Sequence, residues 1–177
     1  MKTLAAALLL LALPAAAHAG GIEDCRSKEQ ISNETRLKAC SAVIDGKQAS
    51  TADTAYAYYK RAMTASANPN ADQAMIMADV SKAIELDPKL MEAYAFRALG
   101  YNRAMQYDKA IADLTTAIGI APDRWGLYLL RAMVEAQKND TKAAIADLEA
   151  ALARNPPASS AESIRLRLAK LKQGAAK

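Results

Sequence analysis

Few residues in this 177-residue chain could carry catalytic chemistry. Its one histidine, His18, stands within an N-terminal segment that has the pattern of a cleaved leader, and its two cysteines are Cys25 and Cys40. Without the leader the chain has no histidine, which excludes Ser-His triads, Cys-His pairs and histidine-ligated metal sites. No nucleophile elbow, S-x-x-K motif or phosphate-binding loop occurs. We therefore expect no catalytic residue, no metal and no cofactor.

Two enzymatic mechanisms stay formally open: a Ser-Lys mechanism, for which no S-x-x-K motif occurs, and a hydrolase that uses two carboxylates. Such a hydrolase needs two acids that converge in one pocket. The acidic residues of this sequence are instead distributed over the ends and outer faces of the helices expected below. An enzyme is therefore the least favoured interpretation.

The N-terminus has the three parts of a secretory signal peptide. Met1-Lys2 is basic, the run 3–13 is apolar, and Ala17-His18-Ala19 has the small-x-small cleavage pattern. The apolar run is shorter than the roughly 20 residues that cross a bilayer, and no later run is long enough. We expect cleavage after Ala19, no transmembrane segment, and an exported protein that is periplasmic or secreted.

Export changes how the cysteines are interpreted. Disulfides form and persist in oxidising compartments, so Cys25 and Cys40 are predicted to form one. The closed loop of about 15 residues would stabilise the fold by roughly 3 kcal/mol in the chain-entropy model. A redox-active pair is the minor alternative, because the spacing is not C-x-x-C.

Composition indicates a helical protein. Hydrophobic residues make up 52% of the chain and charged residues 24%, as in an ordinary globular domain, but aromatic residues only 5%. A chain that is rich in alanine and poor in aromatic residues does not suit a β-sandwich or barrel. Helices that pack through small residues suit it better.

The sequence repeats with a period of 34 residues. Pro88, Pro122 and Pro156 are spaced at this interval, and the segment Ala-Ile-Ala-Asp-Leu at 110–114 recurs at 144–148. Tyr94 and Arg97 recur as Tyr128 and Arg131. A fixed period of this length indicates a solenoid built from stacked helical units.

These residues resemble the tetratricopeptide repeat (TPR) family, whose units have an aromatic and a small residue in the first helix and a closing proline after the second. The middle unit matches at Tyr94, Ala98, Tyr101, Ala110, Leu114, Ala117 and Pro122. The third unit matches at Tyr128, Ala132, Ala144, Leu148, Ala151 and Pro156, but has Glu135 where the second aromatic belongs. The first unit matches at Tyr58, Ala62, Val80, Ala83 and Pro88, with a turn at 66–70 that is two residues longer than usual.

The resemblance implies an all-α, right-handed α-solenoid of three helix-turn-helix units. Its expected divisions are a signal peptide at 1–19, an N-terminal partial unit with the disulfide at 20–54, TPR units at 55–88, 89–122 and 123–157, and a capping helix with a basic tail at 158–177. We expect Arg97–Asp113 and Arg131–Asp147 to bridge the two helices of their units.

The first and last units of a solenoid each have an apolar face without a neighbouring unit, and this face must be covered by another segment. In the partial unit, 35–44 is predicted to be a helix, to which the disulfide ties an extended start. In the cap, Ile164, Leu168 and Leu171 share one face at i, i+4 and i+7, and should cover the last unit.

Positive charge concentrates at the C-terminal end. The whole chain has a formal net charge of +4, of which the leader's Lys2 contributes one. Segment 158–177 contains five basic residues, Arg165, Arg167, Lys170, Lys172 and Lys177, against Glu162 alone. A solvated helix face is the favoured interpretation. Contact with an acidic protein or anionic lipid is the alternative, and export disfavours nucleic acid, so no nucleic-acid partner is expected.

In the TPR family the first helices of successive units line a concave groove that holds peptides. The resemblance places the following residues in that groove: Tyr59, Lys60, Met63, Phe96, Leu99, Asn102, Arg103, Leu130, Met133 and Gln137. One TPR subclass grips a peptide's C-terminal carboxylate with Lys, Arg and Asn side chains. The matching positions here hold Tyr59, Met63, Phe96, Gly126 and Leu130, so this clamp is not expected.

The resulting function hypothesis is a non-catalytic protein–protein interaction module, an adaptor or assembly factor. Its mostly apolar groove with methionine and aromatic side chains suits a hydrophobic or amphipathic peptide of another protein. The alternative is a periplasmic carrier of a small apolar ligand or lipid. A groove covered by the chain's own ends or by a second copy, as in a homodimer, is also left open.

Overall fold

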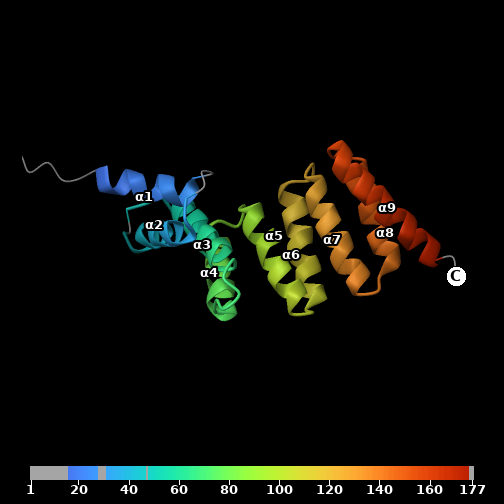
Figure 1. Ribbon diagram of the computed structural model, residues 1–177, viewed down its shortest axis with the longest axis horizontal. Coiled ribbons are helices and arrows are strands. Elements are labelled where there is room, and N and C mark those ends of the chain that lie inside the picture. Colours follow the sequence, from blue (N-terminus) through green and yellow to red (C-terminus); the bar gives the residue numbers. More distant parts are fainter. Residues whose placement is uncertain (1–15, 28–30, 47, 176–177) are drawn as a thin grey trace, which may run out of the picture.

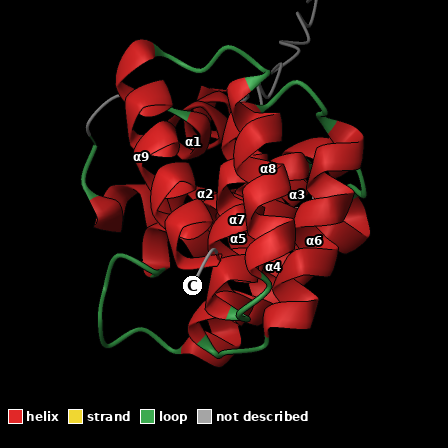
Figure 2. Cartoon of the chain, turned by 90° about the vertical axis from the view of Figure 1, so that its right-hand side faces the viewer, coloured by secondary structure: helices red, strands yellow, loops and turns green. Residues whose placement is uncertain are grey.

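The computed structural model describes residues 16–27, 31–46 and 48–175. Over this part of the chain the secondary structure is helical throughout, without strands (Figure 2). The helices are α1 (Ala16–Arg26), α2 (Asn33–Gly46), α3 (Thr51–Ala65), α4 (Gln73–Leu86), α5 (Met91–Arg103), α6 (Tyr107–Ile120), α7 (Trp125–Gln137), α8 (Thr141–Leu152) and α9 (Ala158–Ala175).

Consecutive helices pack as pairs. The closest partners are α3 with α4, α5 with α6 and α7 with α8, and each pair packs against the next. Figure 1 shows the pairs following one another along the long axis, from α1 at one end to α9 at the other. The all-α solenoid predicted from the period is confirmed.

Small residues let the helices approach each other closely. Ala98, Ala110 and Ala117 are fully buried between α5 and α6, and the equivalent alanines of the next pair are at most 2% exposed. Opposite them, Leu114 and Leu148 fill the space at the centre of their pairs. The packing therefore follows directly from the repeated alanines and leucines.

Helix starts and ends are marked by polar caps and prolines. Ser50, Asp72 and Asp140 accept hydrogen bonds from backbone N–H groups in the first turns of α3, α4 and α8. Capping of this kind typically contributes about 1 kcal/mol. Pro88 and Pro122 stand just after α4 and α6, where a proline cannot continue the helix.

A bidentate ion pair joins the two helices of every unit. Arg97 donates to both carboxylate oxygens of Asp113 at 2.7 and 2.8 Å, and Arg131 does the same to Asp147 at 2.6 and 2.8 Å. Both expected pairs are confirmed.

The first unit has a third such pair, which the 34-residue period does not predict. Arg61 donates to both oxygens of Asp79 at 2.7 and 2.8 Å. These partners are 18 residues apart instead of 16. The two extra residues lie in the longer turn between α3 and α4, so the pair does not follow the 34-residue offset.

Each of these arginines also reaches back to the preceding unit. The Nη1 atoms of Arg61, Arg97 and Arg131 lie 3.3, 3.4 and 3.0 Å from a hydroxyl on the preceding second helix. The acceptors are Ser41 on α2, Ser81 on α4 and Thr115 on α6. One guanidinium thus contacts two successive second helices, and the same contact recurs along the solenoid.

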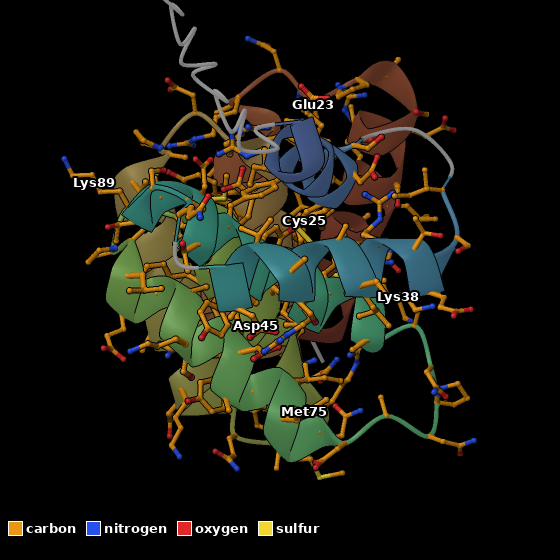
Figure 3. The ribbon with its side chains drawn as sticks, turned by 90° about the vertical axis from the view of Figure 1, so that its left-hand side faces the viewer. Glu23, Cys25, Lys38, Asp45, Met75 and Lys89 are labelled. Atoms are coloured by element: carbon orange, nitrogen blue, oxygen red, sulfur yellow. A yellow bond between two sulfur atoms is a disulfide. The ribbon has the colours of Figure 1, made fainter. Side chains whose placement is uncertain are left out.

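The N-terminal end departs from expectation in one respect. The segment before Cys25 is helical, as α1, and not extended. The predicted disulfide is confirmed: Cys25 and Cys40 are bonded and fully buried, between α1 and α2 (Figure 3). Ile22 and Val43 pack around it, so the buried bond and its apolar surroundings give α1 a fixed place on α2.

The predicted signal peptide lies mostly outside the described residues. The first described helix begins at Ala16 and continues through the expected cleavage point after Ala19. Cleavage there would leave Gly20–Arg26 as the remainder of α1. Within the described part of the chain no helix has the length and hydropathy required to cross a membrane.

The C-terminal helix covers the last unit as predicted. On α9, Ile164 is fully buried, and Leu168 and Leu171 pack against the cluster formed by α7 and α8. An ion pair of 2.7 Å between Lys172 and Glu149 joins α9 to α8. The apolar face of α9 therefore replaces the next unit of the solenoid.

Met105 offers a test of backbone strain, because it has a φ of 56° in the turn after α5 while its side chain is 76% exposed. The equivalent residue of the next unit, Asn139, has a φ of 67°. Asparagine tolerates the left-handed region better than methionine does. We expect Met105→Asn to raise the free energy of unfolding by about 1 kcal/mol in urea titrations. The reciprocal Asn139→Met should lower the free energy of unfolding by a similar amount. If both changes shift it in the same direction, this account is wrong.

Glu135 should make the free energy of unfolding depend on pH. Its pKa is raised from 4.5 to about 7, first by burial and then by the charge of Asp147, with Arg131 acting in the opposite direction. Between these values the folded state holds more protons than the unfolded state, so stability falls as pH rises through this window. The uncharged Glu135→Gln should therefore gain in free energy of unfolding relative to the wild type as pH rises from about 4.5 to about 7, and then level off. A difference that is constant with pH in urea titrations would refute the assignment.

Candidate functional site

The first helices of the three units, α3, α5 and α7, form one surface, which we call the first-helix face. All ten residues predicted for the groove lie on these helices. The structure divides them into residues that pack within the solenoid and residues that remain open to solvent.

An aromatic row joins α3 to α5. The ring centroid of Tyr59 lies 5.8 Å from that of Tyr56 and 6.1 Å from that of Phe96, both edge to face. Tyr59 and Phe96 also pack against the cluster around Val80, so they hold α3 and α5 together as well as forming surface. Such ring pairs contribute about 0.5–1.5 kcal/mol beyond their buried area.

The hydroxyl of Tyr59 has a weak partner. It donates to the Met63 sulfur at 3.4 Å, and burial, with added contributions from Tyr56 and Glu92, raises the pKa of Tyr59 to about 12. The phenol is therefore neutral at physiological pH. A neutral donor held by a thioether keeps the capacity to bond to a better acceptor.

The remaining predicted residues differ in exposure. Met133 is 37% exposed, and Arg103 and Gln137 are exposed as well. Leu99, Asn102 and Lys60 are half-buried. The pKa of Lys60 is lowered by burial and by the charge of Arg36 on α2.

An apolar pocket of about 450 Å³ opens between the starts of α5 and α7. Its volume is in the range typical of ligand sites. Every lining residue belongs to α5, to α7 or to the turn before α7: Met91, Arg124, Trp125, Gly126, Leu127, Leu129 and Leu130. Of these, only Leu130 was predicted for the groove.

The sequence contains a signal for this pocket that the repeat pattern obscures. Trp125 is the only tryptophan of the chain, and it opens the apolar run Trp-Gly-Leu-Tyr-Leu-Leu at 125–130. The pattern assigns to packing only Tyr128 in this run. In the structure Leu127 is buried in the core and Leu130 packs against it. Trp125 and Leu129 pack against the cluster of α7 and α8. The run therefore contributes to the core and lines the pocket as well.

Among the described residues, the terminal helices α1 and α9 do not cover the pocket. The main contacts of α1 are with α2 and α3, and the main contact of α9 is with α8. At the N-terminal end Arg26 pairs with Asp53 at 2.6 Å and lies over the ring of Tyr56 at 5.2 Å. Coverage by α1 thus extends to the beginning of the aromatic row and not to the α5–α7 pocket.

The buried carboxylates have structural partners. Asp79, Asp113 and Asp147 each accept both hydrogen bonds of an arginine fork. In the described segments no three His, Cys, Asp or Glu side chains group in a way that could hold a metal ion. What the first-helix face presents is apolar surface, methionine sulfur and a few cations.

Residues 100–169 match the family model described as tetratricopeptide repeat. Among solved structures, the chain is similar to MamA, residue 41 to the end, from Desulfovibrio magneticus RS-1 (13% identity over 89% of this chain and 94% of that chain, TM-score 0.65). It is also similar to the TPR2B domain of yeast Sti1 in complex with pHsp70 (24% identity, 70% and 98%, TM-score 0.59). A third is the first TPR of Spaghetti, bound to the HSP90 peptide SRMEEVD (17% identity, 71% and 96%, TM-score 0.64).

At these identities the likeness to the solved structures establishes the fold alone. No match was found among curated proteins. The family match and the solved structures agree on the helical unit and on its stacking.

Phe96 and Met133, both predicted for the groove, should behave differently when truncated. Phe96 is packed between α3 and α5, so we expect Phe96→Ala to lower the free energy of unfolding by about 2 kcal/mol. Met133→Ala removes an exposed side chain and should change it by less than about 0.5 kcal/mol. Urea unfolding measures both, and equal losses would mean that Met133 is also packed.

Proposed function

Because residues 100–169 of this chain are tetratricopeptide repeats within an all-helical solenoid, we propose that the protein is a non-catalytic interaction module that binds a hydrophobic or amphipathic peptide of another protein on its first-helix face. One observation carries this proposal, the open apolar pocket between α5 and α7. An apolar opening that the described terminal helices α1 and α9 leave uncovered favours an apolar partner.

Two structural neighbours give the proposal a precedent. One is described as bound to an HSP90 peptide and the other as a complex with pHsp70. In this chain the positions of the carboxylate clamp hold Tyr59, Phe96 and Leu130 among others, so we propose a different chemistry of binding. Apolar side chains on the peptide, and not its terminal carboxylate alone, would supply most of the affinity.

The non-catalytic role follows from what the charged residues already do. The three buried aspartates are each held by an arginine fork. A further buried acid of the described residues, Glu135, lies 3.9 Å from the Nε atom of Arg131. Groups engaged in holding helices together are poor candidates for acid–base work. An adaptor or assembly factor, unlike an enzyme, needs only a binding surface such as the first-helix face.

We further propose that the protein is exported to the periplasm or secreted, with its signal peptide cleaved after Ala19. The buried Cys25–Cys40 disulfide supports this, since such bonds persist in oxidising compartments. Free-thiol assay and N-terminal sequencing of protein recovered from its native compartment test this proposal.

The same pocket supports a second candidate function, the carriage of a small apolar ligand or lipid. Its volume of about 450 Å³ suits such a ligand as well as it suits a peptide side chain. Organic extraction of the purified protein separates the two functions, because a carrier releases a stoichiometric ligand and a peptide-binding module does not.

A peptide selection tests the leading proposal. Displayed random peptides are selected on the purified protein, and their binding is then measured against Met133→Asp. Met133 is exposed on the first-helix face, so a charge there should weaken peptide binding about tenfold. The matched control is Met75→Asp, since Met75 is 54% exposed but lies on α4.

Selective loss with Met133→Asp supports the interaction module. Equal binding to both variants, or failure to select any peptide, would overturn it.

A further inference from the structure

One position in the lining of the α5–α7 pocket carries no side chain. This position is Gly126, and a Cβ added there would meet no atom within 4 Å. At the equivalent position of the preceding two units the sequence has Glu92 and Tyr56. The third unit is thus the one in which this position of the first helix carries no side chain.

The walls of the pocket suit one large apolar side chain. Met91 stands on the α5 side, and Trp125, Leu127, Leu129 and Leu130 stand on the α7 side. Methionine, leucine and tryptophan adapt to aliphatic and aromatic groups alike. Transfer of a leucine- or phenylalanine-sized side chain from water into such a pocket typically tightens binding about tenfold or more.

The pocket also has a charge preference. Arg124 is its one charged lining residue, and the lining contains no carboxylate. Arg124 is exposed at the start of α7, whose first turn has no acidic residue. A carboxylate on a ligand would therefore meet a guanidinium without competition from an acid of the lining, whereas a cationic ligand would be repelled.

We propose that this pocket anchors one large aliphatic or aromatic side chain of the partner peptide, and that Arg124 pairs with an Asp or Glu next to that anchor. The partner segment is thereby an acidic–hydrophobic one. This inference rests on the proposed peptide-binding function. It specifies which residues of the peptide the third unit recognises, namely the apolar anchor and the acidic residue next to it.

Trp125 makes occupancy of the pocket directly measurable. It is the chain's single tryptophan and it lines the pocket, so its fluorescence and its indole N–H resonance report on this site. The probes are blocked serine- and glycine-rich nonapeptides without tryptophan that carry a central Phe-Asp, Phe-Lys or Ala-Asp pair. We expect Phe-Asp to bind most tightly at low salt. Phe-Lys should bind about fivefold more weakly and Ala-Asp about tenfold more weakly.

Two variants, each with a matched control, test the two parts of the site. Gly126→Leu should fill the pocket and weaken Phe-Asp binding more than about tenfold. Gly119→Leu should leave binding unchanged, since Gly119 lies on α6, where an added Cβ also meets nothing within 4 Å. Arg124→Gln should remove the preference of Asp over Lys, while Lys142→Gln, an exposed change on α8, should keep it.

Each outcome of these measurements either supports or contradicts the anchor pocket. Loss of binding with Gly126→Leu, together with loss of the Asp preference in Arg124→Gln, supports the inference. If Arg124→Gln keeps the preference, or if Gly126→Leu still binds Phe-Asp, the inference is wrong. Arg124→Gln changes only an exposed side chain, so it remains informative even if circular dichroism shows that Gly126→Leu does not fold.

Failure of the inference is distinguishable from failure of the proposed function. Peptides from the random selection that bind without changing the Trp125 signals would leave the interaction module standing and overturn the anchor pocket. If neither the selected peptides nor the probes bind, the proposed function fails together with the inference.

Discussion

The bidentate arginine–aspartate pair is the interaction on which the arrangement of the helices depends. Asp79, Asp113 and Asp147 are only 6–7% exposed, and a buried carboxylate is costly unless it is paired and hydrogen-bonded. An arginine fork satisfies both carboxylate oxygens in one geometry, which fixes the position of one helix along the other. Because desolvation offsets much of the attraction, we interpret these pairs as fixing register more than as adding net stability.

The same arginines all extend from the first helices toward the second helices. Each points to its own second helix and to a hydroxyl on the preceding one, for example Arg97 to Asp113 on α6 and to Ser81 on α4. The ion pairs thus lie toward the layer of second helices. The opposite side of the first helices is left to apolar and aromatic side chains such as Tyr59, Phe96 and Leu130. One repeated contact therefore both assembles the solenoid and leaves a surface suited to an apolar partner.

Periodic features were predictable from the sequence, and features that break the period were not. The recurring alanines, leucines and prolines predicted the helical units, and Arg97–Asp113 and Arg131–Asp147 followed from their equal offsets. Arg61–Asp79 was missed because two extra residues in one turn shift its spacing. The helix α1 was missed because Gly20 and Gly21 have low helix propensity, whereas the structure fixes α1 through the buried disulfide and the packing of Ile22. The groove was predicted by resemblance, but the α5–α7 pocket was not, because the family pattern accounts only for Tyr128 in the apolar run 125–130 that lines it.

The third unit differs from the second at two repeat positions, Glu135 and Gly126. The two differences have different physical consequences. Glu135 replaces the aromatic found as Tyr101 in the second unit, and it brings a second carboxyl close to Asp147, where burial and like charge raise its pKa to about 7. Gly126 stands where the second unit has Glu92, and it lines the pocket beside Trp125. Neither change improves packing, and departures from local consistency that do not benefit the fold are expected at functional sites. In a solenoid each unit contacts only its neighbours, so such departures are tolerated locally while the other units keep the register. The third unit is for this reason the part of the chain whose sequence is least explained by folding, and the part on which a partner's specificity should depend.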